Sequence, residues 1–312
     1  MEHEEFEKEI IRQMKESERK REELLNQIIP VKLVIALEGF RSERDRIVIT
    51  EGLEINRAKP EMREEFFKRA KSLDLEIYNS ESCEFFLTYH YQEQRRHAGT
   101  GESSERIFLI SIFFAVCLDV FIKIDKAQSF ISFRGEFESL GIRRIHYRSM
   151  KYERNVQFDD GHFERLKRFW PLFTKQFNEM PHYALVARRY HYSLSRLQWE
   201  DEIIDLTIAL EALLMIEQTK NIGSKIAKRL SKLLWATYDR GKITEVAIEC
   251  YELRNKVVHG EVVNEKYDKI RSLIEMISIC VKQALQLYLT KYHMLPASEF
   301  IKQVDSIPRK KN

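Results

Sequence analysis

The second half of the chain carries apolar residues at the spacing of amphipathic helices. From residue 163 onward they recur every three or four positions, and the breaks fall at prolines, glycines and short polar turns. This pattern predicts helices near residues 182–199, 201–217, 223–239, 243–259 and 265–293. The second of these has a core-facing stripe formed by Leu206, Ala209, Leu210, Leu213 and Leu214. An up-and-down helical bundle is the expected product.

The first half has a mixed pattern. Residues 1–28 are dense in charges of both signs and predict a solvated helical arm, which Pro30 ends. A second helix is expected at residues 61–71, and β-branched and apolar runs predict strands at residues 31–40, 46–55, 73–92 and 130–133. The chain is therefore expected to be mainly α-helical, with an N-terminal mixed α+β domain at 1–165 and a C-terminal all-α bundle at 166–312.

The apolar run at residues 107–122 raises the question of a membrane span. It is shorter than the roughly 20 residues that a bilayer needs, and it carries Asp119. A buried helix or strand is therefore favoured. The N-terminus is acidic and lacks the apolar segment of a signal peptide, and the 4 scattered cysteines are typical of core residues in a reducing compartment. These features predict a cytoplasmic protein without a membrane anchor.

Composition and the absence of common motifs exclude several classes of binding and catalytic site. Lys and Arg number 52 against 49 Asp and Glu, a net charge of +3, so any contact with nucleic acid must come from a local basic patch. The sequence has no Cys-x-x-Cys or His-x-x-x-His pair, no phosphate loop of the Gly-Lys-Ser type and no Gly-x-Ser-x-Gly elbow. We therefore predict neither a metal site nor a bound cofactor.

The fourth helix of the predicted bundle has two differently built faces. The expected core face is a narrow stripe of Val246, Cys250, Leu253 and Val257. On the other side Asn255 and His259 are one turn apart, with Arg254 beside them. The apolar and aromatic residues that share this side are Ile248, Tyr251 and Val258. Because a surface helix of a monomer should be polar there, we expect a second buried face, such as a dimer interface that holds a polar site.

The residues of this polar site suit chemistry on phosphodiesters. A guanidinium such as that of Arg254 binds phosphate oxygens and stabilises charge that develops on them. An imidazole such as that of His259 can move a proton to or from a ribose hydroxyl near neutral pH, and Asn255 could orient the imidazole or the phosphate. The alternative is structural: Arg254 and His259 would complement the helix macrodipole and cap the last carbonyls.

These residues resemble a known motif. LRNKVVHG at 253–260 is similar to the Arg-x(4–6)-His motif of the HEPN superfamily, the helical nuclease domains of prokaryotic defence and toxin systems. DLTIALEALLM at 205–215 and IGSKIAKRLSKLL at 222–234 resemble the Apea-like HEPN branch, which is linked to abortive phage infection. The resemblance covers roughly residues 182–292. More weakly, the upstream domain resembles the N-terminal regions of such proteins.

The resemblance implies a metal-independent endoribonuclease whose active site forms between the two copies of a homodimer. It assigns Arg254 and His259 as the catalytic pair, Asn255 as the polar residue after the arginine, and Glu211 as an acidic residue that would orient the pair. Glu211 could equally be a helix-surface carboxylate. Attack by the 2′-hydroxyl would leave a 2′,3′-cyclic phosphate and a 5′-hydroxyl. In some HEPN toxins a partner enzyme modifies a Tyr two residues after the motif His. This chain has Glu261 at that position, so we do not expect its activity to be controlled by such a modification.

The resemblance also implies a biological role. The protein would be a toxin or effector of antiphage defence, triggered by a phage or host signal that its N-terminal domain senses, unless that domain docks the substrate. The rival hypothesis is a catalytically inactive HEPN module that binds RNA or protein as a scaffold.

Two basic segments interleaved with aromatic residues are candidate RNA contacts. Residues 142–154 supply Arg143, Arg144 and Arg148, and residues 182–196 supply Arg188, Arg189, Tyr192 and Arg196. Cations for phosphates and rings for base stacking are what single-stranded RNA requires. The alternative for each segment is a solvated basic face whose aromatic residues pack inward.

Overall fold

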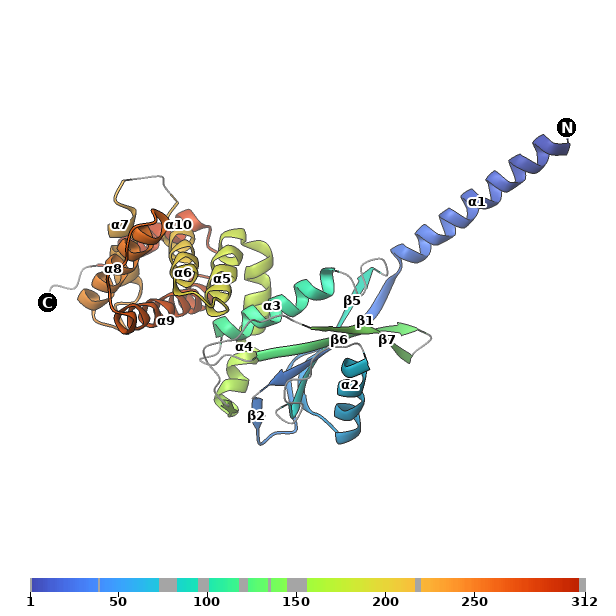
Figure 1. The fold of residues 1–312 in the computed structure, drawn as a ribbon, viewed down its shortest axis with the longest axis horizontal. Helices are drawn as coiled ribbons and strands as arrows, with labels where there is room; N and C mark the ends of the chain where they lie inside the picture. The colour runs from blue at the N-terminus through green and yellow to red at the C-terminus, as the bar shows by residue number, and fades with distance from the viewer. Residues whose placement is uncertain are drawn as a thin grey trace. The chain divides into compact units, whose positions relative to one another are not determined.

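The computed structural model describes residues 2–38, 40–72, 83–94, 101–117, 123–133, 136–144, 156–216 and 220–308. The chain separates into two compact units, Met1–Leu109 with Lys123–Ile145, and Ile110–Ile122 with His146–Asn312. The described residues are mainly helical, with an antiparallel sheet in the first unit and a run of helices in the second (Figure 1). This is the mixed-then-helical order that the sequence predicts. Residues 110–122 and 146–165, which the expected division at residue 165 assigns to the first domain, belong to the second unit.

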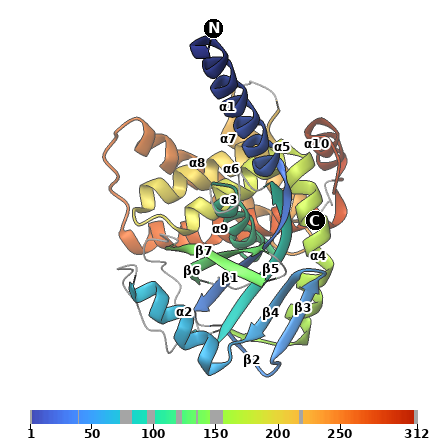
Figure 2. The same ribbon diagram turned by 90° about the vertical axis from the view of Figure 1, so that its right-hand side faces the viewer.

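The first unit is built on its sheet. Among the described residues, the strand order is β3-β4-β5-β1-β6-β7, with antiparallel pairing between neighbours (Figure 2). These strands are β1 (Ile28–Glu38), β3 (Arg46–Thr50), β4 (Leu53–Arg57), β5 (Phe85–Gln94), β6 (Lys123–Phe133) and β7 (Glu136–Arg144); β2 (Phe40–Ser42) follows β1. The helix α2 (Pro60–Ser72) places Phe66 and Phe67 in a buried cluster with Val34 and Phe86 of the sheet.

The expected charged arm is the helix α1 (Glu2–Asn26). Its side chains from residue 11 to residue 26 are exposed, apart from the half-buried Leu25. The helix ends at Asn26, and Pro30 lies inside β1, so the proline does not end the helix as expected. Pro30 lies opposite Gln92 of β5, and the pairing of β1 with β6 starts only at Val31, so Pro30 is in the part of β1 that is paired on one side, where proline is tolerated.

Residues 46–55, expected as one strand, form a hairpin instead. β3 and β4 pair antiparallel, with Ile47 opposite Ile55, and the turn contains Gly52. Gly52 adopts a φ of +79°, in the left-handed region, and a Cβ there would lie 2.8 Å from the carbonyl oxygen of His90. Only glycine satisfies both conditions without strain. In the expected strand at 73–92, β5 begins at Phe85, and residues 73–82 lie outside the described part.

The second unit is a helical bundle. It contains α4 (Asp160–Glu179), α5 (Pro181–Leu194), α6 (Trp199–Leu214), α7 (Ile222–Leu233), α8 (Arg240–Val258), α9 (Tyr267–Lys291) and α10 (Ala297–Ser306), preceded by β8 (Val156–Phe158). The five helices predicted for this half are confirmed as α5 to α9, and each ends earlier than the pattern predicts. The predicted stripe of α6 is entirely buried. α6 contacts α5, α7, α8 and α9, so it lies in the interior of the bundle.

The apolar run is a buried helix over its described part. Residues 107–117 lie in α3 (Gly101–Cys117), where Ile107 and residues 110–117 are buried; Asp119 and its neighbours at 118–122 lie outside the described residues. Among the described helices, α9 is long and apolar enough to cross a membrane by length and composition alone, and 44% of its apolar window is buried inside the protein. The packing of α9 against α4, α5, α6 and α8 is that of a core helix.

Side chains of α7 form hydrogen bonds with the C-terminal ends of α6 and α10. The Arg229 guanidinium donates to both carboxylate oxygens of Asp305 in α10, at 3.2 and 2.9 Å. It also donates to the carbonyl oxygen of Leu214, at the end of α6, at 2.7 Å. The Lys232 ammonium donates to the backbone carbonyl of Asp305. The bond from Arg229 holds the pKa of the Asp305 carboxyl below its usual range.

Candidate active site

The motif helix is α8, which is capped at both ends. At its start, the Asp239 carboxylate accepts a hydrogen bond from the backbone N–H of Lys242 at 2.8 Å. At its end, the last helical residue is Val258, His259 is the C-cap residue, and Gly260 leaves the helical path with a φ of +69°. His259 is therefore an exposed side chain at the C-terminus of the helix, as its position before Gly260 predicts.

The core face of α8 differs slightly from the prediction. It consists of Ile243, Ala247, Cys250 and Leu253. Cys250 and Leu253 are thus confirmed as core residues, whereas Val246 and Val257 are half-buried. All four cysteines are buried and free, as expected of core thiols, and burial raises the pKa of the Cys250 thiol well above its usual range.

An open pocket of about 390 Å³ lies against the other side of α8. Asn255 and His259 both line it, as their spacing of one turn predicts. The remaining lining residues are Ile248, Tyr251 and Glu252 of α8, with Asn221, Ile222, Gly223 and Ser224 at the start of α7. The pocket therefore offers an imidazole, a carboxamide and a carboxylate beside aromatic and aliphatic surface.

Arg254 lies next to this pocket. Its Nη1 donates to Oδ1 of Asn255 at 3.1 Å, and its guanidinium carbon lies 5.7 Å from the centre of the Tyr251 ring. Its Nε is buried and has no hydrogen-bond acceptor among the residues that the structure describes. A buried donor without an acceptor costs about 1–3 kcal/mol, so this position is unfavourable for the stability of the single chain.

Glu211 of α6 is half-buried, and its carboxylate lies close enough to the Tyr251 phenol to act on its pKa. The role that the family resemblance implies for Glu211, orienting Arg254 or His259, stays a prediction. Burial raises the pKa of Tyr251, the nearby Glu211 carboxylate raises it further, and the Arg254 charge opposes them. Glu211 therefore acts on the motif helix at Tyr251.

Gly223 is a residue of the site that the sequence pattern does not single out. It lies in the first turn of α7, where a Cβ would come within 2.7 Å of Cδ1 of Tyr251. The sequence pattern marks Gly223 only as part of the break before the predicted helix at 223–239, which does not reveal this close approach.

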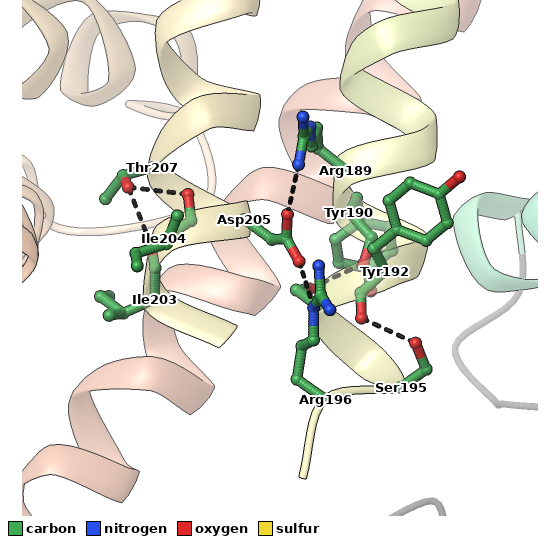
Figure 3. Close-up of polar contacts among 10 residues, drawn as sticks. Arg189, Tyr190, Tyr192, Ser195, Arg196, Ile203, Ile204, Asp205 and Thr207 are labelled. Atoms are coloured by element: carbon green, nitrogen blue, oxygen red, sulfur yellow. Dashed lines mark hydrogen bonds and ion pairs between the residues drawn. The ribbon is translucent and has the colours of Figure 1, made fainter. Parts of the chain in front are cut away.

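Two of the expected RNA-binding arginines are engaged within the bundle (Figure 3). Arg189 of α5 donates to Oδ1 of Asp205 in α6 at 2.9 Å, and Nε of Arg196 donates to Oδ2 of the same carboxylate at 2.6 Å. The Asp205 side chain is only 2% exposed, so the two guanidinium groups compensate a buried charge. Through Asp205, Arg189 joins α5 to α6, and Arg196 joins the segment after α5 to α6.

All the expected RNA contacts stay predictions, those of Arg189 and Arg196 included. Arg188 and Tyr192 are exposed on α5, and the Arg188 guanidinium lies 5.0 Å from the Phe177 ring centre. Arg143 and Arg144 end β7 opposite Ala127 and Lys126. Their side chains, and all of Arg148, lie outside the described residues.

The predicted interface residues of α8 have two environments. Ile248 and Tyr251 are half-buried in the pocket wall, whereas Val258 is 49% exposed. Val262, in the segment after α8, is 80% exposed. Apolar surface is thus exposed around His259 in the single chain.

Within the described ranges, no group of three or more His, Cys, Asp or Glu side chains is arranged to hold a metal ion. No family model, curated protein or solved structure matches the chain.

Proposed function

We propose that this protein is a metal-independent endoribonuclease of the HEPN type, which works as a homodimer in the cytoplasm. The observation that carries the proposal is that Asn255 and His259 line one pocket, and that Asn255 also accepts a hydrogen bond from Nη1 of Arg254 beside it. We place a phosphate group of RNA in this pocket, beside Arg254 and His259.

The chemistry follows from these groups. The ribose 2′-hydroxyl attacks the adjacent phosphorus, the bond from phosphorus to O5′ breaks, and the products carry a 2′,3′-cyclic phosphate and a 5′-hydroxyl. One imidazole accepts the proton of the 2′-hydroxyl and another delivers a proton to O5′, which is why the reaction uses His259 from both copies. Arg254 stabilises the negative charge that develops on the non-bridging oxygens.

The biological part of the proposal rests on the motif resemblance alone. We place the activity in antiphage abortive infection, as a toxin or effector. The first unit then senses a phage or host trigger or docks the RNA.

Incubation of the purified protein with RNA in EDTA tests the activity. The proposal expects cleavage that persists in the chelator, with 2′,3′-cyclic phosphate and 5′-hydroxyl ends identified by sequencing of the RNA termini. Cleavage that requires Mg²⁺ would show that the metal-free mechanism is wrong. Tight RNA or protein binding without cleavage under any trigger would identify the rival, a non-catalytic scaffold.

The homodimer is tested at Val258, the half-exposed apolar residue that precedes His259. We expect Val258→Glu to convert dimers to monomers in sedimentation velocity and to lower the cleavage rate by roughly tenfold or more, because each copy then lacks the other's motif residues. Leu185→Glu is the matched control, since Leu185 is 41% exposed on α5. A monomeric variant that cleaves RNA at the wild-type rate would contradict the shared site.

A further inference from the structure

Tyr251 lies where three helices meet. It belongs to α8, one turn before Asn255, and lines the pocket. Its phenol lies near the Glu211 carboxylate of α6, and its ring lies against Gly223 of α7. Neighbouring helices therefore approach the ring at its hydroxyl end and on its side.

The contact with Gly223 is too close for any other residue. A Cβ at position 223 would lie 2.7 Å from Cδ1 and 2.9 Å from Cγ of Tyr251, atoms of a rigid ring rather than the end of a flexible chain. Glycine weakens a helix by about 1 kcal/mol relative to alanine. The presence of glycine in α7 is therefore explained by the ring that it accommodates.

The Arg254 guanidinium faces the same ring. Its central carbon lies 5.7 Å from the ring centre, inside the range of about 6 Å for cation–π attraction. Asn255 holds Nη1 at 3.1 Å. The ring and the amide together restrict a long side chain that has many rotamers when free.

We infer that Tyr251 is a positioning residue, which holds the Arg254 guanidinium beside the pocket, and that Glu211 and Gly223 hold Tyr251 in place. The effect on reaction rate rests on the proposed ribonuclease function, whereas the arrangement of the side chains does not. A pre-aligned guanidinium meets the phosphate without reorganising in the transition state. A tyrosine that only fills space has no such effect on the chemical step.

The arrangement is tested without any substrate by placing a trifluorinated tyrosine, which titrates near neutral pH, at position 251 of the full chain. Its pKa is read by fluorine NMR. We expect Glu211→Gln to lower this pKa and Arg254→Gln to raise it, because the former removes a nearby anion and the latter a nearby cation. Glu245→Gln, an exposed acid on α8, is the control and should leave the pKa unchanged. The absence of either shift overturns the inference.

The effect on Arg254 is tested by kinetics. Tyr251→Leu should lower kcat by roughly tenfold or more with little change in KM, and Tyr251→Phe should fall between Leu and wild type. A kcat within twofold of wild type for Tyr251→Leu overturns the positioning role even if RNA cleavage is established. If the wild type does not cleave RNA, the proposed function fails, and the fluorine NMR shifts still decide the arrangement.

The role of Gly223 is tested by a double-substitution cycle. Gly223→Ala should lower the unfolding temperature in the wild type and leave it unchanged or raise it in Tyr251→Ala, where the clash is removed and alanine favours the helix. Equal effects in the two backgrounds would show that the ring does not require glycine.

Discussion

Replacing His259 with alanine is expected to lower the rate of RNA cleavage by about 10²- to 10⁴-fold, the usual contribution of a proton-transferring group. Because His259 is exposed at the end of α8, its loss should leave the unfolding temperature nearly unchanged. Initial rates with end-labelled RNA in EDTA, measured beside thermal unfolding, separate the loss of activity from a loss of folding.

His293→Ala is the matched control for this variant. His293 is also exposed, follows α9 and is not part of the pocket lining, so cleavage should stay at the wild-type rate. Arg254→Lys adds a further comparison, since it keeps the charge and loses the planar fork that binds two phosphate oxygens. Unchanged cleavage by His259→Ala would assign proton transfer to another group.

Removing both arginines that bind Asp205 is expected to lower the free energy of unfolding by about 3–5 kcal/mol. In Arg189→Met/Arg196→Met the Asp205 carboxylate, 2% exposed, loses the partners that compensate its charge. Adding Asp205→Asn to this variant should recover much of the loss, because the buried charge is then removed. Urea unfolding followed by circular dichroism gives the three free energies.

The control for the arginine pair is Arg188→Met. Arg188 is exposed on the same helix and should change the free energy of unfolding by less than about 1 kcal/mol. If the double variant is as stable as this control, groups other than Arg189 and Arg196 compensate the charge of the Asp205 carboxylate. The same stability measurements are needed to interpret RNA-binding experiments, because an Arg189 or Arg196 variant can lose RNA binding through partial unfolding.

The helices of the second unit could be predicted because their apolar period is local. The stripe of α6 and the core residues Cys250 and Leu253 of α8 are where the spacing places them. The helix ends were less well predicted, since capping and neighbouring loops decide them. In the first unit, the pattern of residues 46–55 predicted one strand where there are two. The turn between them depends on a single residue, Gly52, which adopts a positive φ.

The ion pairs inside the bundle could not be predicted. Glu202 in the first turn of α6 and Asp205 in the second are both buried, although the sequence shows only ordinary acidic residues there. Their partners come from outside α6: Arg189 of α5 and Arg196 after α5 for Asp205, and Arg271 of α9 for Glu202 at 2.7 Å. A single sequence does not reveal which arginine meets which acid across helices.

The candidate site was predictable only where its residues belong to one helix. Asn255 and His259 are brought together by one turn of one helix, which spacing reveals. The approach of Tyr251 to Glu211 and its close contact with Gly223 involve three helices, so they depend on the tertiary packing.

α7 connects this site to a distant part of the chain. Its first turn forms part of the pocket wall through Gly223, and its later turns bind α10 through Arg229 and Lys232. A substitution at Asp305 can therefore shift the pocket wall through a single helix without altering any residue that lines it. In evolutionary terms, α10 offers a set of positions at which the activity can be adjusted while the motif itself is preserved.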